Sequence, residues 1–257
     1  MAHFALAPWA YVVVFLAAGI AGFVDSIAGG GGIITIPVLL AVGLPPHLAL
    51  GTNKLQSSFG SLAATVKFGR SGLFKLRDII PGIVATAVGA ALGALTVGKI
   101  DSTVLSILIP VMLVCILIFL LVKPRFGLEA GKRRLPPLLF WISAGLLLGF
   151  YDGFFGPGVG TFWAMALVSL AGLDMQSATA HTKAVNFTSN IVSLIMFFFA
   201  GTVVLPIGLI MGAAETAGAY MGSRLVLKRG AALVRVMLIT MTSAALIYLV
   251  LKQWIIK

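Results

Sequence analysis

Residues 22–32 read GFVDSIAGGGG, and residues 149–158 read GFYDGFFGPG. In both copies an aspartate, Asp25 or Asp152, comes a few residues before a cluster of glycines. Each copy is followed by a lysine inside an apolar stretch: Lys54 ends the triplet TNK, and Lys183 ends the triplet HTK. A membrane chain with two matching halves, each interrupted by glycine beside a charged residue, is typical of a transporter with a central binding site.

The composition places this chain in a membrane. Of its 257 residues 60% are apolar and only 10% are charged, and the mean hydropathy is +1.12. A soluble domain carries about 25% charged residues. Continuous apolar runs such as 79–97 and 104–122 approach the roughly 20 residues that a helix needs to cross a bilayer. Because the runs are continuous rather than alternating, we expect an all-α integral membrane protein.

Five helical elements can be predicted in each half. Residues 1–127 then form a first transmembrane repeat and residues 128–257 a second, within one integrated membrane domain. The expected elements are 9–28, 33–43, 51–68, 79–98 and 104–122, then 138–153, 160–172, 177–200, 204–225 and 233–251. The second element of each half rises about 16–20 Å, whereas the hydrocarbon core is about 30 Å thick. We therefore expect short or broken half-helices after the glycine-rich turns, lining a cavity or covered by protein.

The positive charge orients these elements. The net charge is +11, but most of the 18 Lys and Arg residues stand in three short segments, 67–77, 123–134 and 224–235. Such basic loops lie inside by the positive-inside rule and indicate no nucleic-acid partner. The first half has its basic loop before its fourth element and the second half has it after, so placing all three inside inverts one half relative to the other. We expect an inverted-topology repeat with both termini outside.

The glycine clusters are the first candidates for a site. Gly30 and Gly31 let the chain turn at an unrestricted φ and let another group approach the backbone, and Gly158 takes the same part in the second copy. The half-helix that follows presents free N–H groups and the positive end of its dipole, which suit an anion. The alternative is close helix packing through small residues. Repetition beside an aspartate favours a binding site.

A pair of glycines also recurs later in each half, as Gly89/Gly93 and Gly218/Gly222. There we expect only packing.

The two lysines are the second candidates. A lysine near the middle of a membrane helix costs at least about 2.5–3.5 kcal/mol, so it persists where it faces a cavity or a partner. Polar side chains accompany both of them: Asn53, Gln56, His181, Thr182 and Asn186. Two such faces would form a pocket with two ammonium groups for a small oxyanion, such as a sulfonate, sulfite or a carboxylate. The alternative is that each lysine stands at a helix start and extends to the membrane interface.

Three acidic residues complete the candidate site. Asp25 and Asp152 either pair with the lysines, cap the half-helices or take up a coupling proton, and the sequence leaves these roles open. Glu215 has no symmetric counterpart, because the matching position in the first half is Thr86. This asymmetry makes Glu215 the better candidate for a proton site, with a plain helix–helix hydrogen bond as the alternative.

At these residues the chain resembles the sulfite exporter TauE/SafE family, also called the 4-toluene sulfonate uptake permeases. The resemblance rests on segments 22–32, 49–54, 149–158, 178–183 and 221–225, which together span nearly the whole chain. It implies a protein that moves sulfite or sulfur-containing organic anions across the bacterial cytoplasmic (inner) membrane. It implies a class of substrate and not a particular compound.

The residues and the resemblance together predict a secondary transporter of small organic sulfur anions that works by alternating access of inverted repeats. No ATP-binding motif is present, so the energy comes from the substrate's own gradient or from a coupling ion, a proton or sodium. The expected partners are the small anion and the lipid bilayer, and a homodimer is left open. We expect no cofactor or metal and no enzymatic activity. An anion channel and a transporter of a non-sulfur carboxylate remain as alternatives.

Overall fold

The computed structural model describes residues 6–122 and 132–229. This part of the chain forms α-helices and no strand, which confirms the all-α prediction. The helices are α1 (Pro8–Ala28), α2 (Gly31–Ala41), α3 (Pro46–Arg70), α4 (Leu76–Val97), α5 (Ser102–Val122), α6 (Pro137–Phe154), α7 (Val159–Ser169), α8 (Met175–Phe199) and α9 (Leu205–Arg229). The last expected element, 233–251, and both chain ends lie outside the described residues.

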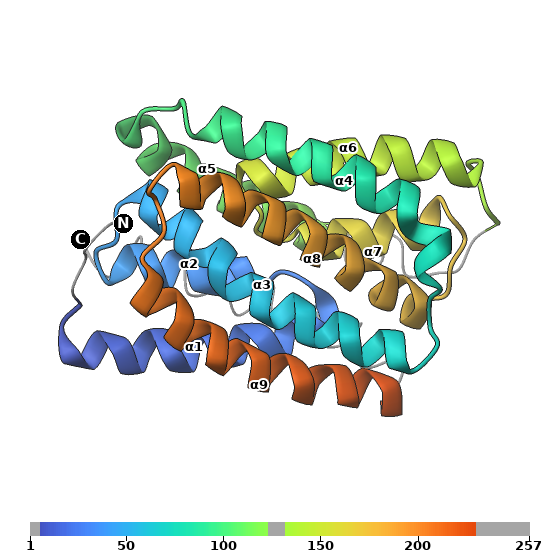
Figure 1. Ribbon diagram of the computed structural model, residues 1–257, viewed down its shortest axis with the longest axis horizontal. Coiled ribbons are helices and arrows are strands. Elements are labelled where there is room, and N and C mark those ends of the chain that lie inside the picture. Colours follow the sequence, from blue (N-terminus) through green and yellow to red (C-terminus); the bar gives the residue numbers. More distant parts are fainter. Residues whose placement is uncertain (1–5, 123–131, 230–257) are drawn as a thin grey trace.

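Most helices run along the long axis of the molecule (Figure 1). Within the described part, α1, α4, α6 and α8 are long and apolar enough to cross a bilayer. The helices α3 and α9 are each 25 residues long, but they contain charged residues that lower their hydropathy. Aliphatic side chains cover the outward faces of several helices, as in α4, where Val84, Val88 and Leu92 are exposed. An apolar outer surface of this kind suits lipid rather than water.

The second helix of each half is short, as expected. Both α2 and α7 have 11 residues, which corresponds to a rise of about 16 Å. The helix α2 begins at Gly31, inside the glycine run, and not at residue 33 as expected. The helix α7 ends at Ser169 rather than at 172, because Gly172 turns the chain with a φ of 73°. A buried apolar cluster that includes side chains of α5 packs over both half-helices.

The third helix also begins earlier than the sequence indicates. We expected it to start at residue 51, but α3 starts at Pro46. A proline is tolerated in the first turn, where its missing N–H has no partner in any case. Lys54 therefore lies in the interior of the helix. The interfacial alternative would place it in the first turn instead.

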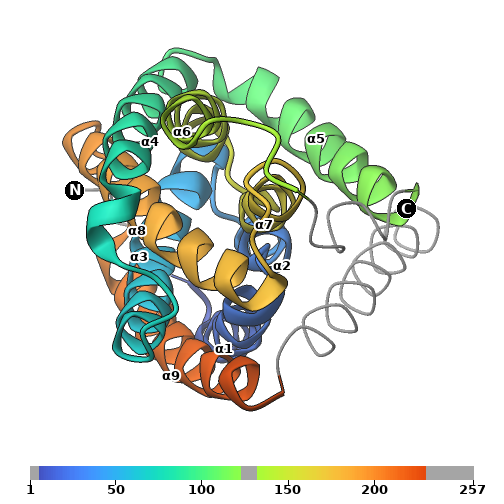
Figure 2. The ribbon, with the colours of Figure 1, turned by 90° about the vertical axis from the view of Figure 1, so that its right-hand side faces the viewer.

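The two halves make the same helix pairings. The fourth helix of the first half, α4, packs along α6 of the second half, and α9 of the second half packs along α1 of the first. The third helices α3 and α8 pack against each other at the centre. In Figure 1 the colours show that α1 and α6, α3 and α8, and α4 and α9 run in opposite directions along the long axis. Seen from one end, α4, α9, α1 and α6 lie around α2, α7 and α8 (Figure 2). Each half is therefore built into the other.

Glycines make the crossed pairings close. A Cβ atom on Gly89 would collide with the backbone of α6 near Leu146, and one on Gly93 would collide with the carbonyl oxygen of Phe150. A Cβ on Gly218 would likewise collide with the carbonyl oxygen of Gly19 in α1. The duplicated glycine pairs are thus packing surfaces, as expected for small residues between membrane helices.

Candidate functional site

The two glycine-rich turns meet in the interior of the molecule. A Cβ atom on Gly29 would lie 2.5 Å from the backbone of Gly160, and a Cβ on Gly32 would lie 3.3 Å from the Cα of Pro157. The residues at the N-caps of α2 and α7, Gly30 and Gly158, both have the left-handed conformation, with φ of 98° and 78°. Glycine reaches this conformation at little cost, so the repeated glycines serve both the turn and the close approach. The N-termini of both half-helices therefore lie together.

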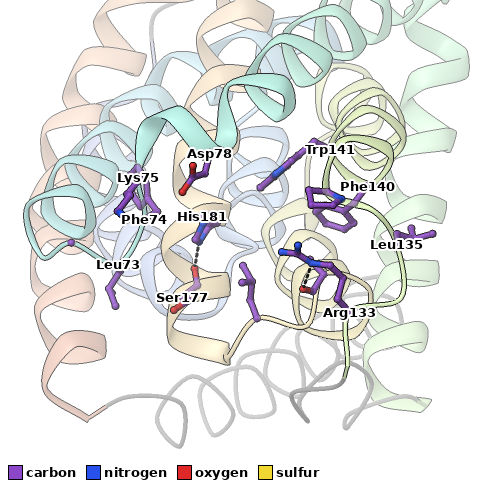
Figure 3. A pocket seen from close by; sticks show the side chains of 14 residues that line it. Leu73, Phe74, Lys75, Asp78, Arg133, Leu135, Phe140, Trp141, Ser177 and His181 are labelled. Atoms are coloured by element: carbon purple, nitrogen blue, oxygen red, sulfur yellow. Dashed lines mark hydrogen bonds between the residues drawn. The ribbon is translucent and has the colours of Figure 1, made fainter.

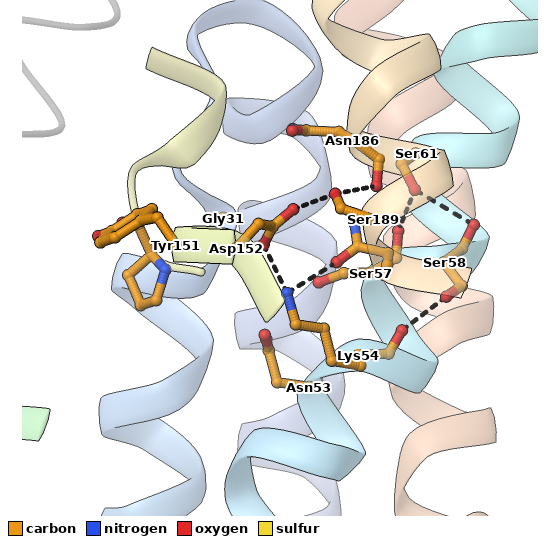
Figure 4. Close-up of polar contacts among 12 residues, drawn as sticks. Gly31, Asn53, Lys54, Ser57, Ser58, Ser61, Tyr151, Asp152, Asn186 and Ser189 are labelled. Atoms are coloured by element: carbon orange, nitrogen blue, oxygen red, sulfur yellow. Dashed lines mark hydrogen bonds and ion pairs between the residues drawn. The ribbon is translucent and has the colours of Figure 1, made fainter. Parts of the chain in front are cut away.

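Lys54 forms the first ion pair beside these turns. Its Nζ atom lies 2.5 Å from Oδ1 of Asp152 and donates a hydrogen bond of 3.3 Å to the Asn190 side chain. The hydroxyl of Ser189 donates to the other carboxylate oxygen of Asp152 (Figure 4). Lys54 and Asp152 are each only 2% exposed. The charged groups are thus compensated and hydrogen-bonded, as burial requires.

Lys183 forms a second pair of the same kind. Its Nζ atom lies 2.8 Å from Oδ2 of Asp25, and the exposed fraction is 0% for Lys183 and 17% for Asp25. The other oxygen of Asp25 accepts a 3.2 Å hydrogen bond from the backbone N–H of Gly31, the first residue of α2. Asp25 therefore connects the ammonium group of the second half to a free N–H group of the first half-helix.

Both ion pairs cross between the halves. The lysine on α3 pairs with the aspartate on α6, and the lysine on α8 pairs with the aspartate on α1. An ion pair thus stands beside a glycine turn twice: the Lys183–Asp25 pair lies at the N-terminus of α2, and the Lys54–Asp152 pair lies beside the turn before α7. Beside the first ion pair, a Cβ on Gly156 would lie 3.0 Å from Nζ of Lys54 and 2.9 Å from Oδ1 of Asp152. Neither lysine extends to the surface.

Several of the other predicted polar residues lie in this interior. Asn53 donates a 2.7 Å hydrogen bond to the hydroxyl of Thr35 on α2, which ties α3 to the half-helix. Gln56 is fully buried, and neither polar atom of its side chain has a hydrogen-bond partner among the described residues. The same holds for the hydroxyl of Thr182 and for Oδ1 of Asn186, on α8. Buried polar groups without partners are costly, so the interior retains hydrogen-bonding capacity that a polar ligand can use.

Glu215 lies in a narrow space between α1 and α3. It is 1% exposed, and its Oε2 atom has no hydrogen-bond partner in the described part of the chain. A Cβ on Gly60 would lie 2.7 Å from its Oε1 atom, and a Cβ on Gly22 would lie 2.7 Å from its Cγ atom. Gly22 and Asp25 stand three residues apart on α1, so they share one face of that helix, and Asp25 pairs with Lys183. The structure therefore places Glu215 next to the second ion pair.

His181 is found elsewhere. It lines a cavity of about 570 Å³ at one end of the molecule, where its Nδ1 donates a 2.7 Å hydrogen bond to the carbonyl oxygen of Ser177 and its ring stacks on Trp141 (Figure 3). The cavity is lined by the α3–α4 loop and the start of α4, by the segment before α6 and the start of α6, and by the α7–α8 loop. The lining residues include Leu73, Phe74, Lys75, Asp78, Arg133, Leu135, Phe140 and Leu173. His181 is thus part of a cavity wall, and not a neighbour of the lysine pairs.

Two contacts of the site had no signal strong enough to select them from the sequence. Nothing in the sequence distinguishes Thr35 from the other residues of the short second element, yet its hydroxyl accepts the hydrogen bond from Asn53. Tyr151 donates a 2.5 Å hydrogen bond from its hydroxyl to the carbonyl oxygen of Pro157, which fixes the second glycine turn. The position of Tyr151 next to Asp152 in the repeated motif was the one available hint. No three His, Cys, Asp or Glu side chains gather as metal ligands within the described ranges.

Comparison with known proteins gives a consistent assignment. The family model described as "Sulfite exporter TauE/SafE" matches residues 14–249. The chain is 44% identical over 248 residues to the probable membrane transporter protein YfcA of Escherichia coli K12, covering 95% of this chain and 92% of that protein. It is 43% identical over 235 residues to the probable membrane transporter protein ORF9 of a Sinorhizobium species (91% and 90% covered). A probable membrane transporter protein of Haemophilus influenzae is 41% identical over 230 residues (90% of each chain). No solved structure matches the chain.

The crossed ion pairs predict a pattern of stability. Asp152→Asn leaves the ammonium group of Lys54 buried without a counter-charge, so we expect the free energy of unfolding to fall by about 3–5 kcal/mol. Lys54→Met leaves the carboxylate of Asp152 unpaired and should also be costly. The double variant Lys54→Met/Asp152→Asn removes both charges, and we expect it to recover most of either loss. Thermal unfolding of the detergent-solubilised protein compares the three variants with the wild type. Additive losses in the double variant would contradict a direct interaction between the two side chains.

Proposed function

Because the chain belongs to the sulfite exporter TauE/SafE family, we propose that it is a secondary transporter of small organic sulfur anions, such as sulfonates or sulfite. The family and the related proteins are described as membrane transporters, so the chain is a membrane transporter rather than an enzyme. The choice of a sulfur oxyanion rests on the family description together with the chemistry of the buried site.

The observation that carries the proposal is that two buried ammonium groups stand beside the glycine turns, where the N-termini of the two half-helices meet. Lys54 and Lys183 are buried, and the glycine-rich turns that precede α2 and α7 lie against each other. Helix N-termini and ammonium groups both favour an anion with several oxygen acceptors. In this arrangement the carboxylates of Asp25 and Asp152 hold the lysines. A sulfonate or sulfite that displaces one carboxylate keeps the ammonium group compensated, so binding need not leave a buried charge unpaired.

Alternating access of two inverted repeats is the proposed mechanism. Three features support this mechanism. The matching helices run in opposite directions in Figure 1, α4 pairs with α6 and α9 with α1 across the halves, and two short helices lie at the centre. In such transporters one repeat moves against the other around a site near the bilayer midplane. We place the protein in the bacterial cytoplasmic membrane with residues 67–77 inside. With five helical elements in each half, both termini then lie outside.

The cavity beside His181 is the proposed vestibule on the inner side. Lys75 and Arg133 stand on its wall, and both belong to the basic segments that we place inside. Cationic side chains at the mouth of a cleft raise the local concentration of an anion. Trp141 lines the cavity, and its ring lies 6.2 Å from that of the fully buried Trp163. We propose that this aromatic layer closes the path from the cavity to the interior. Movement of that aromatic layer would open the inner path.

A transport assay in proteoliposomes tests the function. We expect saturable counterflow of methanesulfonate or sulfite, because a carrier exchanges labelled for unlabelled anion. Lys183→Ala should lose counterflow and ligand-induced thermal stabilisation, because it removes one of the two ammonium groups. The matched control Lys99→Ala changes an exposed lysine in the loop after α4 and should retain both. Current without exchange would favour a channel, and activity with carboxylates alone would favour a carboxylate transporter. Unaltered counterflow in Lys183→Ala would contradict the proposed pocket.

Cysteine labelling tests the orientation. On a Cys115→Ala background, Arg70→Cys and Ala200→Cys introduce thiols at exposed positions that end α3 and follow α8. If the halves are inverted as proposed, a membrane-impermeant maleimide added to intact cells labels position 200 and leaves position 70 unlabelled until the cells are opened. Labelling of both positions from the same side would contradict the proposed orientation, because α3 and α8 would then have the same direction in the membrane.

A further inference from the structure

Glu215 breaks the internal symmetry of the site. Its match in the first half is Thr86, and both side chains are buried on helices that play the same structural part. The match is visible in the packing, because Gly22 lies against the backbone of Glu215 and the corresponding Gly149 lies against the backbone of Thr86. The fold therefore accepts an uncharged side chain at this position, so helix packing alone does not require a carboxylate.

A second asymmetry lies on α3, at the residue that contacts Glu215. The residue of α8 that corresponds to Gly60 of α3 is Ser189, whose hydroxyl donates to Asp152. In the first half that hydroxyl is replaced by the bare Gly60, and the carboxyl group of Glu215 fills the space next to it. A Cβ on Gly60 would lie 2.6 Å from the Cγ atom of Glu215, so any larger residue at position 60 would displace the carboxyl group. One ion pair thus has a neutral hydroxyl donor where the other has an additional carboxyl group.

The charges around Glu215 can be counted. Among the described residues, the charged groups beside it are Asp25, on the same face of α1 as its contact Gly22, and Lys183 of α8, which pairs with Asp25; α3 contributes Gly60 at the contact. With both carboxyl groups ionised, this trio carries one net negative charge, and with a proton on Glu215 it is neutral. An anion that approaches Lys183 adds negative charge to the trio. A proton on Glu215 offsets that charge, so the proton and the anion each favour the binding of the other.

We propose that Glu215 is the site of a coupling proton, which binds and crosses the membrane together with an anion held at Lys183. The proposal rests on the proposed transport function and names its coupling ion. The proton resides on the Glu215 carboxyl group while the anion is bound, and it leaves when the anion leaves. Oε2 of Glu215, which has no partner among the described residues, is available to carry it. The Lys54–Asp152 pair has the hydroxyl of Ser189 in the place where the Lys183–Asp25 pair has the Glu215 carboxyl group.

The test separates exchange from coupling. Methanesulfonate is a suitable probe, because its charge does not change across the neutral pH range. Wild-type proteoliposomes should show counterflow at equal pH and should accumulate the anion when the interior is made alkaline. Glu215→Gln imitates the protonated carboxyl group, so it should keep counterflow but lose pH-driven accumulation. Thr86→Val at the symmetric position is the matched control and should keep both activities. Undiminished pH-driven accumulation in Glu215→Gln would overturn the proposal.

A binding measurement on the wild type does not depend on how the variant folds. In weakly buffered detergent solution, measured over a series of pH values, methanesulfonate should cause proton uptake that reaches about one proton per bound anion where the empty protein has released its proton. Anion binding or counterflow without proton uptake would overturn the role of Glu215 and leave the transport function standing. If no sulfonate and no sulfite gave either binding or counterflow, the transport function would be overturned, and this inference with it.

Discussion

The burial of two lysines inside a membrane bundle is the constraint on which the structure depends. An ammonium group at the centre of a membrane helix is costly, by at least about 2.5–3.5 kcal/mol, unless it has a partner. Each lysine finds its aspartate on a helix of the other half. The two repeats are therefore joined at the centre by charge, as well as at the periphery by the glycine contacts of α4 with α6 and of α9 with α1.

The second constraint is the backbone of the half-helices. Polar N–H groups that are not bonded within a helix are tolerated at membrane depth only where protein or a polar cavity satisfies them. Asp25 accepts from the N–H group of Gly31, and the two glycine turns cover each other. The same groups are the ones that an oxyanion would use. Stability and the proposed function thus draw on one set of atoms, for which a transported anion would compete with the aspartates.

Much of this arrangement could be predicted from the sequence, because the repeat supplies a second reading of each motif. The helical class, the short second element of each half and the packing role of Gly89 and Gly93 are visible in composition and spacing. The partner of each lysine is not visible, because pairing across the halves depends on how the repeats interlock. The sequence predicts that His181 shares a pocket with Lys183, because the two residues stand only two positions apart in the chain. In α8 they face different surroundings, because residues two apart lie on different sides of a helix. The space around Glu215 is set by Gly22 and Gly60, from two other helices, and no local pattern indicates it.

Locating a bound anion tests the central claim most directly. A crystal of the protein with a bromine-substituted sulfonate would give an anomalous signal that marks the ligand. The account predicts the sulfonate oxygens within hydrogen-bond distance of Nζ of Lys54 or Lys183, beside the N-terminus of α2 or α7, with the corresponding aspartate displaced. A sulfonate bound elsewhere, with both lysine–aspartate pairs unchanged, would contradict it.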